Sequence, residues 1–196
     1  AFIREFRTDT GKYKGVYITI TSTGIGGASC AIAVEELIAC GGKNFIRIGS
    51  AGALQPGINI GDQVIPIAAV REEGASKMYV PENYPAVADF KLASYVIETA
   101  KQLQYPHVSG LVRSHDSFYS DRQEEIVSFW GSKGILASDM ETATLYTVAR
   151  LRGARAACIL NVVVSRGDSI KEGINQYQTV EGPAKEGERR EIILAL

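Results

Sequence analysis

Apolar residues repeat along the chain with two periods, and segments of the two kinds alternate. Runs rich in β-branched and aromatic residues predict five strands, at residues 16–21, 44–48, 62–70, 108–112 and 156–164. Apolar residues three or four positions apart predict four helices, at residues 28–40, 90–103, 140–152 and 183–196. Strands that alternate with helices favour a three-layer α/β domain with a largely buried sheet. We expect one such domain over residues 1–196.

Composition and charge narrow the functional classes. The net charge of −1 gives no sign of a surface for nucleic acid or anionic lipid. No apolar run approaches the roughly 20 residues that span a bilayer. The first residues given have no charged segment followed by an apolar one, so we do not expect secretion. Three cysteines, Cys30, Cys40 and Cys158, lie in apolar surroundings, which favours reduced thiols in a cytoplasmic protein. With only two histidines and no ligand-like spacing, we expect no metal site.

Two glycine-rich segments, residues 22–27 and 49–52, directly follow predicted strands. Glycine permits positive φ and close backbone approach, and turn amides that point one way attract anions. We expect both segments to be turns, with or without a ligand. Neither fits the dinucleotide-binding fingerprint or the phosphate-loop lysine pattern.

Arg47 lies among apolar residues of a strand that we expect to be mostly buried. A buried arginine needs an anionic partner. Together with the hydroxyl of Ser50 and the glycine-rich segment, Arg47 is a candidate phosphate ligand. The alternative is an internal ion pair with an aspartate or glutamate.

Acidic residues also stand where a helix is predicted to begin. Asp139 and Glu141 either cap that helix, which suits Asp139 better, or bind a ligand. The two carboxylate oxygens of Glu141 match a pair of sugar hydroxyls. Arg166 follows the last predicted strand, at the sheet edge where α/β proteins bind ligands.

At these positions the chain resembles the uridine phosphorylase branch of the hexameric nucleoside phosphorylase family. The similarity runs through essentially the whole chain and is strongest in residues 4–6, 22–27, 33–37, 47–52, 74–76, 84–90 and 139–143. Several such blocks in the right order are more specific than any one of them. The resemblance implies a nucleoside phosphorylase-like fold, with a mixed, twisted central sheet flanked by helices.

The resemblance assigns roles to individual residues. It implies that Arg47 and Ser50 hold phosphate, and that Arg4 reaches the phosphate of a neighbouring subunit. Its nucleoside-binding positions are Ser50, Gly52, Phe118, Arg122, Gln123, Met140, Glu141 and Arg166. Within this set, Glu141 would hold the ribose hydroxyls, Phe118 the base, and Arg166 the polar edge of the base. A monovalent cation such as K⁺ is implied at Glu5, Ile25 and Ser29, between subunits.

The chain also departs from the family pattern. The family's first strand and Gly-Asp loop fall upstream of Ala1. Its uracil-reading Gln and Arg fall at Arg122 and Glu124, although Gln123 with Arg122 could serve in a shifted register. The segment between Glu125 and Asp139 is shorter than in typical uridine phosphorylases and is similar to the purine enzymes. Those enzymes place an acid near Arg166, where this chain has Arg166 itself and Asp168 two residues on, so a pyrimidine base is favoured.

The implied activity is that of a pentosyltransferase, which splits uridine with inorganic phosphate as co-substrate and needs no metal or organic cofactor. Arg47, Glu141 and Arg166 are the implied catalytic residues. The implied assembly is a homohexamer of dimers that share active sites. The alternatives are a purine nucleoside phosphorylase, a nucleosidase that uses water, or a non-catalytic nucleoside-binding subunit of the same fold.

Overall fold

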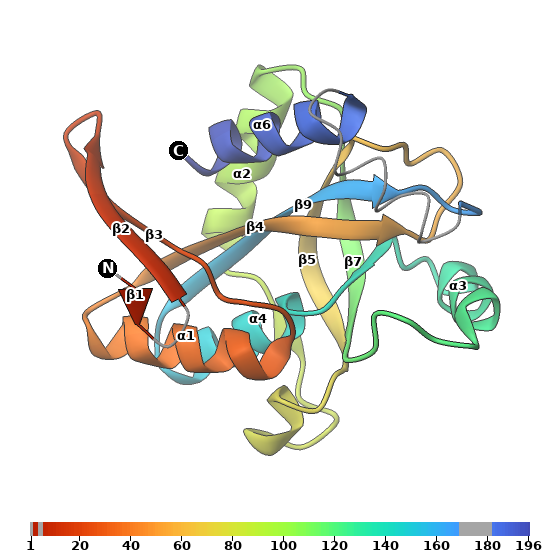
Figure 1. Cartoon of the computed structure of the whole chain (residues 1–196), viewed down its shortest axis with the longest axis horizontal. Coiled ribbons are helices and arrows are strands. Elements are labelled where there is room, and N and C mark those ends of the chain that lie inside the picture. The colour runs from red at the N-terminus through yellow and green to blue at the C-terminus, as the bar shows by residue number, and fades with distance from the viewer. Residues whose placement is uncertain (1, 4–5, 169–181) are drawn as a thin grey trace.

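The computed structural model describes residues 2–3, 6–168 and 182–196. Its helices are α1 (Gly27–Ala39), α2 (Phe90–Gln102), α3 (Gln123–Ser132), α4 (Thr142–Leu151) and α6 (Pro183–Ala195), with a 3₁₀ turn η1 (Ser76–Met78). The strands of the central sheet are β4 (Asn44–Ala53), β5 (Gln63–Glu72), β6 (Ala86–Val87), β7 (His107–His115), β8 (Ala137–Asp139) and β9 (Arg155–Val164). Helices α1 and α4 cover one face of this sheet and α2 and α6 the other (Figure 1). The expected three-layer α/β architecture is confirmed.

Within the described residues, the central sheet is mixed and has the order β6-β5-β7-β8-β4-β9. Strands β5, β7 and β8 are parallel to one another, and β4 is parallel to β9 but antiparallel to β8. Strand β5 also pairs with β9, through Gln63 with Asn161 and Val64 with Leu160. The sheet therefore curls until its two sides meet.

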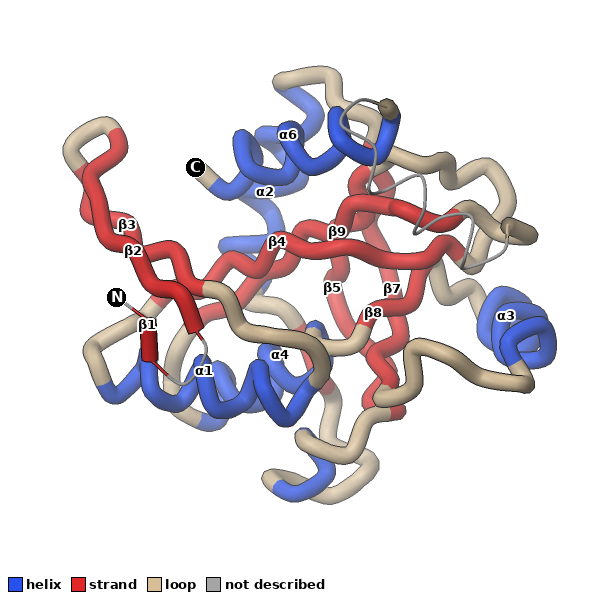
Figure 2. Tube along the Cα trace, in the orientation of Figure 1, coloured by secondary structure: helices blue, strands red, loops and turns tan. Residues whose placement is uncertain are grey.

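A second, antiparallel sheet is formed by β1 (Phe2–Ile3), β2 (Phe6–Tyr13) and β3 (Val16–Thr21). Strands β2 and β3 make a hairpin that extends away from the central sheet beside α1 (Figure 2). Several apolar side chains of this hairpin are exposed, among them Val16, Tyr17 and Ile20.

Two hydrophobic clusters lie on the two faces of the central sheet. On the α1 and α4 side the core includes Val34, Tyr146 and Leu160, and on the α2 and α6 side it includes Ile65 and Ile159. Strand β9 contributes to both, since residues 156–162 are buried without interruption. This matches the double-sided burial expected from its apolar run.

Helix ends follow local chemistry. Asp89 caps α2, where its carboxylate accepts a hydrogen bond from the backbone N–H of Leu92 at 3.0 Å. Pro183 occupies the first turn of α6, where its missing N–H costs no hydrogen bond.

Two expectations about β4 were wrong. The strand continues through the glycine-rich residues 49–52 to Ala53, so this segment is not a turn. The strand is also only partly buried, because Ile46 and Ile48 are 36% and 38% exposed. Its partner β9 occupies one edge, and along the described chain β8 reaches the other edge only at Gly52 and Ala53.

Among the described residues, no helix is long and apolar enough to cross a membrane.

Candidate active site

Arg47 lies on β4 and faces two carboxylates. Its side chain is 15% exposed, and Nη1 lies 3.2 Å from Oδ2 of Asp139, while Nη2 donates to Oε2 of Glu141. Its guanidinium lies directly over Gly49, where a Cβ atom would stand 2.7 Å from Nη2. Glycine at this position therefore makes room for the arginine, although it forms no turn. We call Arg47, Asp139 and Glu141 the arginine cluster.

The two carboxylates of the arginine cluster accept hydrogen bonds from different parts of the fold. Oδ2 of Asp139 accepts from the backbone N–H of Thr142 at 2.9 Å and from its hydroxyl at 2.6 Å, which fixes the start of α4. Oδ1 accepts from the hydroxyl of Ser114 at 2.6 Å. Glu141 instead turns back to the β3–α1 turn, where the N–H of Gly26 donates to its Oε1 at 2.6 Å. Asp139 thus holds the start of α4 and contacts β7, whereas Glu141 links Arg47 to the β3–α1 turn.

The β3–α1 segment is the glycine-rich turn expected from the sequence. Gly24 and Gly26 have φ of 67° and 89°, values that favour glycine. The turn amide of Gly26 binds an anion, as the pattern predicted, and in the structure that anion is the carboxylate of Glu141. The internal ion pair, one of the two interpretations of Arg47, is therefore present.

Charges at the arginine cluster keep Arg47 protonated. Burial lowers the pKa of its guanidinium, but the Cys158 sulfur and the two carboxylates raise it above the ordinary value. Burial raises the pKa of the Cys158 thiol to about 11, so this group is neutral at physiological pH. One guanidinium against two carboxylates gives the arginine cluster a net negative charge when both acids are ionised.

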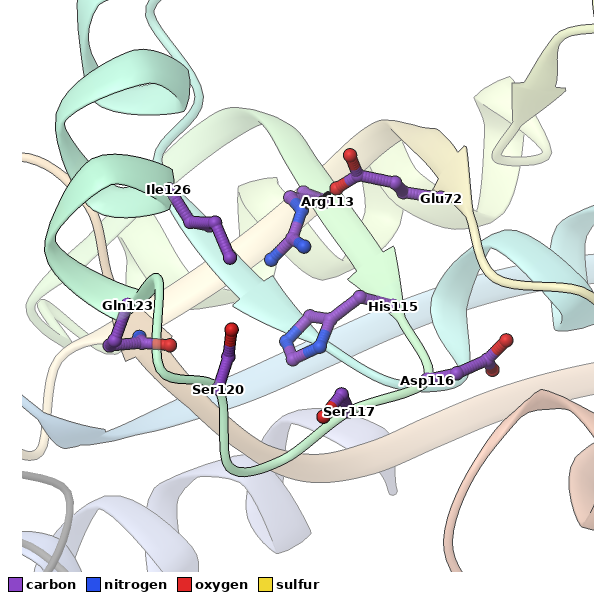
Figure 3. A pocket seen from close by; sticks show the side chains of 8 residues that line it. All are labelled: Glu72, Arg113, His115, Asp116, Ser117, Ser120, Gln123 and Ile126. Atoms are coloured by element: carbon purple, nitrogen blue, oxygen red, sulfur yellow. Dashed lines mark hydrogen bonds and ion pairs between the residues drawn. The ribbon is translucent and has the colours of Figure 1, made fainter.

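A polar pocket of about 200 Å³ opens nearby, between the ends of β5 and β7, the loop after β7 and the start of α3. Its lining residues are Glu72, Arg113, His115, Asp116, Ser117, Ser120, Gln123 and Ile126. Figure 3 shows Arg113, His115 and Gln123 directed into the pocket and Asp116 directed away from it. Arg113 is 6% exposed, and its Nε donates to Oε2 of Glu72. The pocket combines a fixed cation with amide, imidazole and hydroxyl groups.

The polar pocket and the arginine cluster are joined through the β7–β8 pair. Arg113 stands opposite Ser138 on the pocket side, and Ser114 stands opposite Asp139 on the arginine cluster side. Burial and Arg113 lower the pKa of His115, and the charge of Asp139 acts in the opposite direction. The charge of Asp139 in the arginine cluster therefore acts on His115 across the strand pair, and His115 is neutral at physiological pH.

The remaining nucleoside positions are not gathered around either centre in the described contacts. Ser50 is exposed and, by the alternation of side chains along a strand, faces away from Arg47. Phe118 is 44% exposed and packs edge to face on Tyr119. Arg122 is exposed and binds both carboxylate oxygens of Glu125. Arg166 is exposed beside Gly131 of α3.

Met140 and Gly52 are half-buried on the segments that flank the arginine cluster. Among the expected cation ligands, Ile25 is 78% exposed, and the hydroxyl of Ser29 donates to the carbonyl of Thr23 at 2.6 Å. Arg4 and Glu5 lie outside the described residues. No group of three or more potential metal ligands occurs in the part of the chain that the structure describes.

Arg113 and His115 were not singled out from the sequence. The apolar pattern ended the predicted strand at Val112, whereas β7 continues to His115. Arg113 could have been found by the pattern that identified Arg47 and Arg166, an arginine that adjoins an apolar strand.

Comparison with known proteins places this arrangement in a family. The sequence model of the phosphorylase superfamily matches residues 1–189. A uridine phosphorylase of Thermococcus kodakarensis is 48% identical over 85% of this chain, which spans 64% of that protein. A guanosine phosphorylase of Halorubrum lacusprofundi is 36% identical over 98% of this chain and 80% of its own length. The crystal structure of uridine phosphorylase from Vibrio fischeri superposes on this chain with a TM-score of 0.90 at 46% sequence identity. The superposition covers all of this chain and 79% of the Vibrio fischeri chain. The chain belongs to the phosphorylase superfamily.

Proposed function

We propose that this protein is a pentosyltransferase that splits uridine with inorganic phosphate into uracil and ribose 1-phosphate. The observation that carries the proposal is the half-buried Arg47 beside Glu141, which puts an anion-binding group next to a group suited to sugar hydroxyls. The similarity to proteins named uridine phosphorylase supports the choice of base.

The proposed reaction is a single displacement at C1′ of the ribose. A phosphate oxygen forms a bond to C1′ while the bond from C1′ to the base breaks, and its electron pair leaves with the base, which then takes a proton from water. Arg47 orients the phosphate, Glu141 orients the ribose through its hydroxyls, and Arg166 steadies the charge on the leaving base. The scheme needs no metal, organic cofactor or covalent intermediate.

The charge of the arginine cluster implies a further cation. Two carboxylates outnumber the one guanidinium, so a phosphate dianion would meet net repulsion at Arg47 alone. We assign the missing positive charge to Arg4 of a neighbouring subunit, in a homo-oligomer built from dimers, most simply a hexamer. K⁺ between subunits at Glu5, Ile25 and Ser29, a cytoplasmic location and a role in nucleoside salvage belong to the same proposal.

The test is the phosphate dependence of base release. We expect uracil from uridine to appear only with phosphate, together with an equal amount of ribose 1-phosphate. Arg47→Ala should lower kcat/KM for phosphate by about 100- to 1,000-fold, the usual cost of removing one positioned donor to a developing charge. The control is Arg150→Ala, which removes an exposed arginine of α4.

Other outcomes point to the alternatives. Base release without phosphate indicates a nucleosidase, and unchanged phosphate kinetics in Arg47→Ala contradict the role of Arg47. Guanosine belongs in the same assay because of the Halorubrum relative. No release from any nucleoside indicates a binding subunit.

A further inference from the structure

A second pocket, of about 410 Å³, lies where α1 and α4 end and where β4 and β9 begin. Its volume falls in the range of pockets that bind small molecules. Among the described residues that line it, the polar side chains are those of Lys43, Arg152 and Arg155, and all three are cationic. We call it the basic pocket.

The three cations keep donors that the described chain does not use. Arg155 donates through Nε to Oδ1 of Asn44 at 2.7 Å, so both of its terminal nitrogens remain open. Arg152 is held by Glu35, which accepts from Nε and Nη2 and leaves Nη1 open. The ammonium group of Lys43 has no hydrogen bond or ion pair within the described residues. Two oriented guanidinium groups and a free ammonium group are prepared donors for an anion.

Positive charge at the basic pocket exceeds what the fold itself needs. The ends of α1 and α4 both face the pocket, and a helix C-terminus carries roughly half a unit of negative charge. Arg152 is neutralised by Glu35, whereas Lys43 and Arg155 form no ion pair among the described residues. Two unpaired cations against about one unit of negative charge from the two helix ends leave a net positive site.

The rest of the lining offers an apolar surface beside the cations. Gly41 and Gly153 end the two helices with φ of 98° and 70°, values that favour glycine. A Cβ atom at either position would meet no atom within 4 Å, so both glycines border open space. Ile38 and Ala154 supply an apolar wall. A planar ring attached to an anion fits such a surface.

The cations come from separate positions along the chain. The start of the β4–β9 pair brings Lys43 and Arg155 together, since the backbone N–H of Arg155 donates to the carbonyl of Lys43 at 2.9 Å. Arg152 comes from the turn after α4. A chain of linked phosphates contacts such a set of cations at once, whereas a single phosphate contacts fewer of them.

The basic pocket is separate from the arginine cluster. Helices α1 and α4 run side by side (Figure 1). Helix α1 begins next to Gly26 and α4 directly after Glu141, at the arginine cluster, and the pocket lies at the other ends of both helices. With 13 and 10 residues, these helices put about 15–20 Å between the two. A ligand in the basic pocket therefore does not displace phosphate from Arg47.

We infer that the basic pocket binds the di- or triphosphate group of a small molecule through Lys43, Arg152 and Arg155. Nucleoside di- and triphosphates and inorganic polyphosphate share this chemistry. The inference is independent of the proposed function, since it uses no residue of the arginine cluster or of the polar pocket.

The experiment measures calorimetric binding of tripolyphosphate and of adenosine triphosphate. We expect both to bind to the wild type at low salt, with an affinity that falls as salt is added, because the contacts join exposed charges. Lys43→Met and Arg155→Met should each weaken binding by about tenfold or more, as for the loss of one hydrogen bond to a charged group.

The matched control is Arg150→Met, which removes an exposed arginine of α4 that does not line the pocket. It should keep the wild-type affinity, and so should Arg47→Ala at the other end of the helices. If thermal melting shows that Arg155→Met does not fold, Lys43→Met carries the test, because its ammonium group has no bond to lose within the described chain.

The inference is overturned if neither triphosphate binds to the wild type, or if either folded variant, Lys43→Met or Arg155→Met, keeps the wild-type affinity. A comparable loss in Arg47→Ala would place the ligand at the arginine cluster and overturn it as well. When the inference holds, the two ligands separate the sources. Tighter binding of adenosine triphosphate means that its ring packs on the apolar wall and that the ligand is a nucleotide, and equal affinities mean that the phosphate chain alone is recognised.

Discussion

Asp139 and Glu141 are two residues apart, yet their hydrogen bonds make them different chemical groups. Every oxygen of Asp139 is engaged by the fold, at Ser114, Thr142 and Arg47. Within the described residues, Glu141 is held by the Gly26 amide, the Arg47 guanidinium and a long contact from the Met140 amide, and in the proposed complex it binds the ribose. Substitution should therefore damage folding at Asp139 and substrate binding at Glu141.

Glu141→Gln should penalise ribonucleosides more than 2′-deoxyribonucleosides. The carboxylate accepts from both the 2′- and 3′-hydroxyls in the proposed complex, and the deoxy substrate lacks one of them from the start. We expect the loss in kcat/KM to be about tenfold larger for uridine than for 2′-deoxyuridine, as for one hydrogen bond to a charged group. Steady-state kinetics on both substrates measure this. Equal losses would mean that Glu141 does not contact the 2′-hydroxyl.

At the scale of single residues, the sequence predicted charged residues whose position along the chain is unusual. Arg47 stood out because a charged group in apolar surroundings needs a partner, and Glu141 because it stands where a helix was predicted to begin; the structure pairs the two. The same rule missed Arg113, because the predicted strand stopped one residue before it. Gly49 was taken for a turn residue, and only the position of the Arg47 guanidinium shows why a side chain is excluded there.

Among the elements, α6 carries a buried acid. Glu191 is 5% exposed, and its Oε2 has no hydrogen-bond partner within the described chain. Burial raises its pKa to about 8, although backbone hydrogen bonds from Gly49 and Asn161 and the charge of Arg47 act against this shift. The acid is therefore protonated in the folded state over a range where it is ionised in the unfolded chain.

Because of this difference, the contribution of Glu191 to the free energy of unfolding decreases as the pH rises. A raised pKa of the folded state means that the contribution of Glu191 is complete below about pH 4.3 and is lost as the pH rises through about 8. Glu191→Gln stays neutral, so its stability relative to the wild type should increase with pH across that window, by up to about 1.4 kcal/mol per pH unit.

Urea unfolding of both proteins at several pH values measures this difference. The control is Glu186→Gln on the same helix, where the acid is half-exposed and paired with Arg190. A difference between wild type and Glu191→Gln that does not change with pH would contradict the prediction.

The helices and strands that the sequence predicted are those with one continuous apolar run or one apolar stripe. Strand β9 is an apolar run, and α2 and α6 carry one apolar stripe each, so hydrophobic burial alone specifies them. Strand β8 has three residues and is defined by its neighbours β7 and β4, which no local pattern reveals. Strand β2 is mostly polar and exists through its hairpin with β3, and α3 has no buried residue to mark a stripe.

At the scale of the whole molecule, the proposed site is completed between subunits. The prediction is that inactive Arg4→Ala and inactive Arg47→Ala proteins regain activity when mixed under conditions that allow subunits to exchange. Half of the dimers would then be mixed, and each would hold one intact site of two, so recovery should approach about a quarter of the wild-type activity in a two-fold assembly. Turnover of uridine after mixing measures it.

Sedimentation gives the control, since it reports whether the subunits assemble and exchange. A monomer would exclude a shared site. Exchange without recovered activity would assign Arg4 and Arg47 to the same subunit's pocket.

The contact between β5 and β9 also has a consequence for how the chain is made. These strands lie roughly a hundred residues apart in sequence, so their pairing carries a large loop-closure cost and cannot begin until β9 exists. While the chain is being synthesised, β4 lacks its parallel neighbour β9, and β5 lacks its antiparallel pairing with β9. The nascent protein thus exposes unpaired strand edges until β9 has been synthesised, which is the interval in which chaperones protect such a chain from aggregation.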